Sequence, residues 1–155
     1  SGVGKRGAKV NWNVAVRMLM AWGITLPAAG AMGALTWFVG HTIGGLAGAT
    51  YIDKMDNFAR KVQQGEPTIS AVTDRIYLDV GAQQSLTSSA GRFTIEGDGR
   101  CAVLWNAWTN DKTIPDMGEG NHVGYVCLER GDVADHAPTL PPGGAYHTTM
   151  TLAYA

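Results

Sequence analysis

Cysteine is scarce in this 155-residue sequence, and no CxxC pair occurs. The two cysteines present, Cys101 and Cys127, lie in apolar runs at a spacing that fits no zinc motif. This scarcity excludes a disulfide-dense scaffold and a cysteine-based metal centre. Buried free thiols are the favoured interpretation of both residues, with a disulfide between them as the alternative.

Acidic residues are missing from the first 48 positions, which hold Lys5, Arg6, Lys9 and Arg17. The other 8 of the 12 basic residues and all 13 acidic ones follow, so the net charge of −1 conceals a basic start and an acidic remainder. Neither part has the Lys/Arg-rich stripe of a nucleic-acid-binding surface, which excludes that class of partner. The sequence also lacks a phosphate-binding loop of the G-x-x-x-x-G-K-[ST] type.

Charged side chains are absent from Met18 to Ile52, a run of 35 residues. About 20 apolar residues cross a bilayer as a helix, and Trp22 and Trp37 stand where interfacial aromatics are common. We therefore expect an apolar helix within residues 1–44, with a basic flank before it and membrane association through residues 18–40. A soluble, glycine-rich buried helix is the alternative. A cleaved signal peptide fits less well, because the run is too long and begins too late.

From Tyr51 onward the pattern changes to the two-residue period of β-strands. In "TDRIYLDV", Ile76 and Leu78 fall on one face while Arg75 and Tyr77 fall on the other, and "RFTIEG" alternates in the same way. Further strands are predicted at "CAVLWNAW", "GYVCLER" and "AYHTTMTLAYA", separated by turns at "GDGR", "DMGEGN" and "LPPGG". The predicted fold class is mainly β.

One family resemblance covers residues 45–155 and rests on separate segments in a fixed order, namely "GLAGATYIDKMDNFARKVQQGE", "TDRIYLD", "VLWNAW", "DMGEG" and "YVCLE". In this order they resemble the carboxy-terminal part of the hexose-6-phosphate 1-epimerases, relatives of galactose mutarotase. The resemblance implies a partial antiparallel β-sandwich of the galactose-mutarotase-like type. It also implies interconversion of the α and β anomers of sugars such as glucose 6-phosphate. The family's amino-terminal half, whose arginines bind the sugar phosphate, has no counterpart here.

A second resemblance covers residues 8–45 and rests on "KVNWNVAVRMLMAWGITLPAAGAMGALTWFVGH". This segment is similar to the last membrane segment of PiT-type inorganic phosphate transporters, in which a W-x-x-T-L-P core is common. The two families share no fold. The resemblances together therefore predict a chimeric chain with its junction near Gly44–Gly45.

Mutarotation needs one group that takes the proton from the anomeric hydroxyl and another that protonates the ring oxygen. A carboxylate and an imidazole suit this work. The resemblance implies that Glu129, in "YVCLE", is the general base. For the acid it points to His41, whose His-Thr pair begins like the family's "HTYF" motif but continues with Ile43 and Gly44. The alternatives are an exposed strand-end carboxylate for Glu129 and a transporter-segment residue for His41.

Three further residues are candidates for binding substrate. The resemblance matches Asp74 to a family acid that contacts sugar hydroxyls and places Asp116 in a loop near the site. Arg75 offers a guanidinium for bidentate phosphate binding. The alternatives are turn roles for both aspartates and a solvated strand charge for Arg75. No metal and no cofactor are expected, and the histidines without motif support are His122, His136 and His147.

The first hypothesis is a glucose-6-phosphate 1-epimerase, an aldose-phosphate mutarotase that is incomplete as this chain and whose β region is cytoplasmic. Its substrate class is a hexose 6-phosphate or another aldose. The alternatives are a membrane-transport fragment of the inorganic phosphate transporter type and an inactive sugar-binding remnant. An incomplete sandwich leaves open sheet edges, so we expect a homo-oligomer that completes it.

Overall fold

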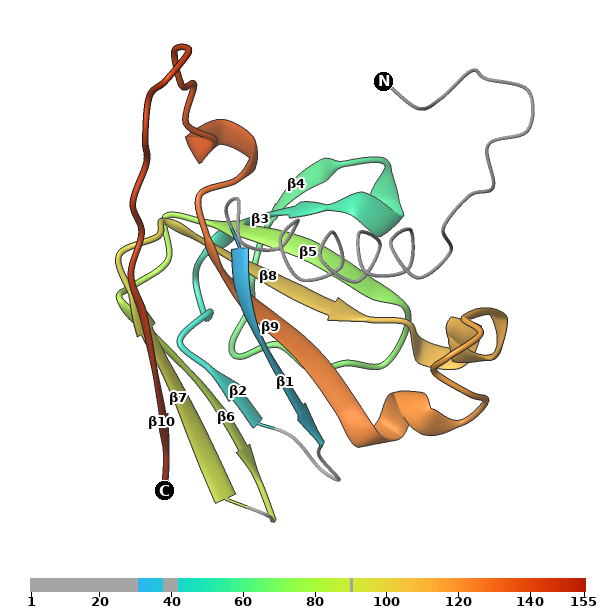
Figure 1. Cartoon of the computed structure of the whole chain (residues 1–155). Coiled ribbons are helices and arrows are strands. Elements are labelled where there is room, and N and C mark those ends of the chain that lie inside the picture. Colours follow the sequence, from blue (N-terminus) through green and yellow to red (C-terminus); the bar gives the residue numbers. More distant parts are fainter. Residues whose placement is uncertain (1–30, 38–41, 90) are drawn as a thin grey trace, which may run out of the picture.

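The computed structural model describes residues 31–37, 42–89 and 91–155, which form two antiparallel β-sheets facing each other (Figure 1). The larger sheet has the strand order β1 (Ala31–Trp37), β9 (Tyr125–Gly131), β8 (Cys101–Asn106), β5 (Thr73–Leu78), β3 (Thr50–Asp53) and β4 (Ala59–Val62). The smaller sheet has the order β10 (Met150–Tyr154), β7 (Gly91–Gly97), β6 (Gln83–Ser88) and β2 (Thr42–Gly44). Short 3-10 helices lie between strands: η2 (Lys54–Asp56), η3 (Trp108–Thr113), η4 (Asn121–Gly124) and η5 (Ala134–His136).

The first described residues are β rather than helical. Strand β1 pairs antiparallel with β9 along its whole length, and β2 pairs with β6. The prediction of an apolar helix is therefore wrong over residues 31–37 and 42–44, because the backbone there bonds to a neighbouring strand instead of along its own segment. The rest of that prediction, residues 1–30 and 38–41, lies outside the described residues. Among the helices that the structure does describe, none is long and apolar enough to cross a membrane.

The strands predicted from alternation are confirmed. "TDRIYLDV" contains β5, "RFTIEG" lies within β7, "CAVLWNAW" and "AYHTTMTLAYA" contain β8 and β10, and "GYVCLER" covers β9 except for its last residue. The two cysteines are free, as predicted, with Cys101 buried and Cys127 partly buried. The sequence "QQSLTS" of β6 is polar and was not predicted as a strand, although Gln84, Ser85 and Leu86 are buried there.

Alternation along the strands sorts side chains onto two faces of the larger sheet. We call the inner face the one that packs against the smaller sheet, in a core cluster that includes Tyr77, Leu86, Ile95, Leu104 and Leu128. The outer face is the opposite one, and it carries a smaller apolar cluster formed by Ile52, Leu78 and Cys101.

Gly44 and Gly45 lie at the predicted junction between the two resemblances. Gly45 has a φ of 88°, and a Cβ built there would lie 2.5 Å from the carbonyl oxygen of Gln83, so only glycine fits. The backbone N–H groups of residues 45–47 donate hydrogen bonds of 3.0, 3.1 and 3.2 Å to the carboxylate of Glu66. The segment that spans the junction is therefore fixed both by packing and by hydrogen bonds.

Candidate functional site

Two predicted site residues share the outer face of the larger sheet. The register pairs Ile76 with Val103, and Val103 with Glu129, so these side chains lie on one face. Asp74 stands two residues before Ile76 and therefore lies on that same face. Strands β5, β8 and β9 run side by side (Figure 1), which places Asp74 and Glu129 on either side of β8.

Glu129 is partly buried, and two neighbouring charges act on it. Burial raises the pKa of Glu129 above its usual value, the positive charge of Lys54 lowers it, and the negative charge of Asp74 raises it further. The Nζ of Lys54 lies 2.7 Å from Oδ1 of Asp74. The ammonium group of Lys54 therefore forms an ion pair with Asp74 and also acts electrostatically on Glu129. A carboxylate whose pKa is raised in this way is a stronger base than an ordinary carboxylate.

Trp105 of β8 lies between the strands of the two carboxylates, and Cys127 lies two residues before Glu129 on β9. They are paired with each other across β8 and β9, and Trp105 is paired with Asp74 across β5 and β8. Burial, and then the charge of Glu129, raises the pKa of Cys127 to about 11. The thiol is therefore protonated at neutral pH and is a poor nucleophile. The proton-exchanging groups of this surface are its carboxylates.

Arg75 lies on the inner face, away from Asp74 and Glu129. Its guanidinium carbon stands 4.9 Å from the centre of the Tyr51 ring, and its Nη1 donates a 3.4 Å hydrogen bond to Oε1 of Gln63. The structure thus does not bring Arg75 together with the two carboxylates. This placement follows from the strand period, because neighbouring residues point to opposite faces.

The last two predicted residues are not part of this group. Asp116 is exposed in the loop between η3 and η4, outside the outer-face pair. His41, the predicted acid, lies outside the described residues.

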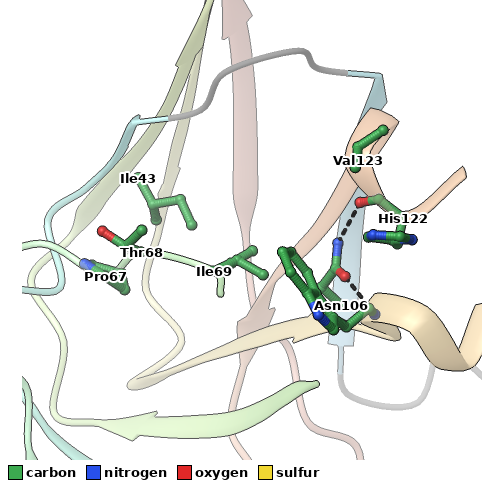
Figure 2. A pocket seen from close by; sticks show the side chains of 8 residues that line it. Ile43, Pro67, Thr68, Ile69, Asn106, His122 and Val123 are labelled. Atoms are coloured by element: carbon green, nitrogen blue, oxygen red, sulfur yellow. Dashed lines mark hydrogen bonds between the residues drawn. The ribbon is translucent and has the colours of Figure 1, made fainter. Parts of the chain in front are cut away.

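A separate cavity of about 250 Å³ lies where β8 ends (Figure 2). Its apolar side chains come from the smaller sheet and from the connections between strands, among them Ile43 of β2, Ile69 of the β4–β5 loop and Val123 of η4. Polar side chains of Thr68, Asn106 and His122 also line it. Asn106 is an inner-face residue, because β8 alternates and Leu104 belongs to the core.

Asn106 ties together the two loop segments at this cavity. Its Nδ2 donates hydrogen bonds of 2.9 and 2.8 Å to the carbonyl oxygens of His122 and Tyr125. Its Oδ1 accepts a 2.7 Å bond from the backbone N–H of Trp108. Because Asn106 is only 1% exposed, these bonds are shielded from water, and they fix η3 and η4 relative to β8.

The buried Asp111 pairs with His122, which is partly buried and lines the cavity. Oδ2 of Asp111 lies 2.8 Å from Nδ1 of His122 and accepts a 2.9 Å hydrogen bond from the His122 backbone N–H. Burial alone would raise the pKa of Asp111, but the hydrogen bonds from His122 hold it below its usual value. The ring of His122 also lies 4.9 Å from that of Trp108, centre to centre.

Sequence reasoning missed Asn106, Asp111 and His122 as a group. The aspartate and histidine are 11 residues apart, with no motif between them, and the loop conformation alone brings them together. The one sequence signal was "WNAW", where a polar residue ends an apolar strand. Within the described residues, no three His, Cys, Asp or Glu side chains gather as a metal site.

Two solved structures share the fold. A putative mutarotase, YeaD, from Salmonella typhimurium superposes with a TM-score of 0.59 at 21% identity, over 64% of this chain and 36% of that one. The protein HI1317 superposes with a TM-score of 0.63 at 18% identity, over 79% of this chain and 45% of that one. At these identities the likeness establishes a mutarotase-like β-sandwich, and this chain spans less than half of either structure.

A short amino-terminal stretch has different relatives. Over 49 residues the chain is 59% identical to probable low-affinity inorganic phosphate transporters of Mycobacterium bovis and Mycobacterium tuberculosis, and 55% identical to that of Mycobacterium leprae. The match covers 32% of this chain and 12% of each transporter. No protein-family model matches the chain. A short transporter match thus accompanies the mutarotase-like fold.

Proposed function

We propose that residues 45–155 correspond to the carboxy-terminal part of an aldose-phosphate mutarotase of the glucose-6-phosphate 1-epimerase type. One observation carries the proposal: Glu129, with a raised pKa, shares the outer face with Asp74 on a mutarotase-like sandwich. Its substrate class is a hexose 6-phosphate or a related aldose.

Glu129 acts as the base in this proposal. Its carboxylate takes the proton of the anomeric hydroxyl while an acid protonates the ring oxygen, which breaks the bond between C1 and that oxygen. Rotation about the C1–C2 bond and reclosure then give the other anomer: the open-chain hydroxyl returns its proton to the acid, and protonated Glu129 returns its proton to the carbonyl oxygen at C1, which becomes the anomeric hydroxyl again. Asp74, held by Lys54 at 2.7 Å, accepts hydrogen bonds from sugar hydroxyls.

The acid of the reaction is assigned to His41, which is a proposal from the sequence resemblance alone. Arg75 lies on the inner face and takes no part in the proposed site, and Asp116 is offered only as a loop residue that approaches substrate. The two solved relatives are more than twice as long as the matched region, so full turnover requires elements beyond the described sandwich.

Exchange between the anomers of glucose 6-phosphate, followed by NMR, tests the assignment of the base. We expect Glu129→Gln to lower the exchange rate above buffer by roughly 10²–10⁴-fold, because an amide cannot accept the proton. Glu119→Gln is the matched control, since Glu119 is exposed in the η3–η4 loop. A native chain that exchanges anomers no faster than buffer would instead favour an inactive sugar-binding remnant.

A membrane-transport fragment is the second candidate, favoured by the 59% identity to phosphate transporters over 49 residues. Under this hypothesis the first segment carries the function and the sandwich is an appendage. Co-flotation with liposomes tests it: the full chain should float, and a variant without residues 18–40 should not. Recovery of both proteins in the aqueous fraction would reject membrane association through this segment.

A further inference from the structure

The cavity at the end of β8 is independent of the outer-face carboxylates. It is lined by Asn106 and by Ile43 of the smaller sheet, whereas Asp74 and Glu129 lie on the other face of the larger sheet. A ligand held here would therefore not contact the proposed catalytic pair.

The Asp111–His122 pair determines which nitrogen of the imidazole can accept a hydrogen bond. An ionised carboxylate only accepts hydrogen bonds, so Nδ1 of His122, 2.8 Å from Asp111, carries the proton in the neutral ring. Nε2 is then left with a lone pair, and no described residue hydrogen bonds to it. Because Asp111 is 1% exposed and also binds the His122 backbone N–H, the ring orientation is fixed in advance.

The remaining walls restrict the chemistry of a ligand. No Lys, Arg, Asp or Glu side chain lines the cavity among the described residues, which disfavours an ionic ligand. Most lining side chains are apolar, and Trp108 adds an indole beside His122. The polar groups of Asn106 are already occupied by backbone partners, so the polar side chains left for a ligand are those of Thr68 and His122. A polyol would therefore leave most of its hydroxyls without partners, whereas an apolar ring with one donor would not.

We propose that this cavity binds a small neutral ring compound that contacts Trp108 and donates one hydrogen bond to Nε2 of His122. The volume of about 250 Å³ accommodates a molecule of one or two rings. Asp111 is a positioning residue here, since it fixes the imidazole without contacting the ligand.

Phenol and anisole are suitable probes, because they share a ring and an oxygen but only phenol donates a hydrogen bond. Both are titrated into the full-length chain, with binding followed by chemical shifts of cavity residues and by the side-chain ¹⁵N resonances of His122. We expect saturable binding of both and roughly two- to ten-fold tighter binding of phenol, as one neutral hydrogen bond provides. The Nε2 resonance of His122 should move with phenol and stay in place with anisole.

The His122→Asn variant should abolish the preference for phenol and leave anisole binding unchanged. Its amide can still reach Asp111 from the position of Nδ1, but it lacks the second nitrogen. His147→Asn is the matched control, since His147 is exposed and far along the chain, and it should keep the preference. If His122→Asn does not fold, Val123→Trp serves instead, because Val123 is 59% exposed at the rim and a larger side chain there should exclude both probes.

Three results would overturn the proposal. The first is the absence of saturable shifts for either probe, and the second is equal affinity for phenol and anisole in the native chain. The third is displacement of phenol from the cavity by glucose, because this result would show that the cavity binds a polyol.

Discussion

The two faces of the larger sheet carry opposite kinds of chemistry on the same strands. Leu128 and Glu129 are neighbours in β9, yet Leu128 is 1% exposed within the core, while Glu129 lies among charged groups on the outer face. On β5, likewise, Asp74 faces outward and Arg75 faces inward over Tyr51. Neighbouring residues of one strand therefore have different roles: those on the inner face stabilise the fold, and those on the outer face are available for reaction.

The largest effect on stability is expected when a side chain of the inner face is truncated. We expect Leu128→Ala to lower the free energy of unfolding by about 2–5 kcal/mol, because it leaves a cavity in a packed core. Urea denaturation followed by circular dichroism measures the loss. Val103→Ala is the control on the outer face, where Val103 is only partly buried, and should cost less. Equal losses from both variants would contradict the assignment of faces.

Neutralising Glu129 should change how stability depends on pH. Below about pH 4.5, its ordinary value, the carboxyl is protonated in both folded and unfolded chains. As the pH rises from there through the raised pKa of the folded state, the unfolded chain releases the proton more readily, so the native fold loses stability. Glu129→Gln stays neutral and should escape this loss.

Urea denaturation of native and variant chains at several pH values measures this effect. The difference in free energy of unfolding should move in favour of Glu129→Gln between about pH 4.5 and neutrality. An opposite trend would mean that the folded state lowers the pKa of Glu129, and the electrostatic contrast between the faces would be lost.

The smallest effect is expected from a substitution of Lys54, which should change the pKa of Glu129 on the outer face. The positive charge of Lys54 lowers the pKa of Glu129, so Lys54→Met should raise that pKa further. An NMR titration of the Glu129 side-chain carboxyl measures the change. Lys112→Met, an exposed change in η3, should leave the pKa in place. A pKa unchanged by Lys54→Met would show that the ammonium is screened by solvent.

Much of the fold could be predicted because several strands carry a clear local pattern. β5 and β7 alternate apolar and polar residues in a two-residue period, β8 and β9 contain short apolar runs, and glycine-rich or loop-forming turns separate the strands. Strands β1 and β2 could not be predicted in this way, because an uncharged apolar run is compatible with a helix and with a strand alike. Pairing of β1 with β9 is a long-range contact, which local patterns do not encode.

The candidate site was predictable only in part. Glu129 and Asp74 were proposed from sequence segments, and the register places them on one face, but their roles in catalysis remain predictions. Arg75 was proposed because its guanidinium could bind a phosphate, but the strand period puts it on the face opposite to its neighbour Asp74. The Asp111–His122 pair depends on the path of a loop, for which no periodic pattern exists.

The three hydrogen bonds from residues 45–47 to Glu66 have a mechanical consequence. A force applied to β2 passes to β6 through the pairing of the two strands, and to the β4–β5 loop through the bonds from residues 45–47 to Glu66. The force is thus distributed over both sheets. Although two glycines mark this position in the sequence, it is anchored against bending, and the chain has no hinge there.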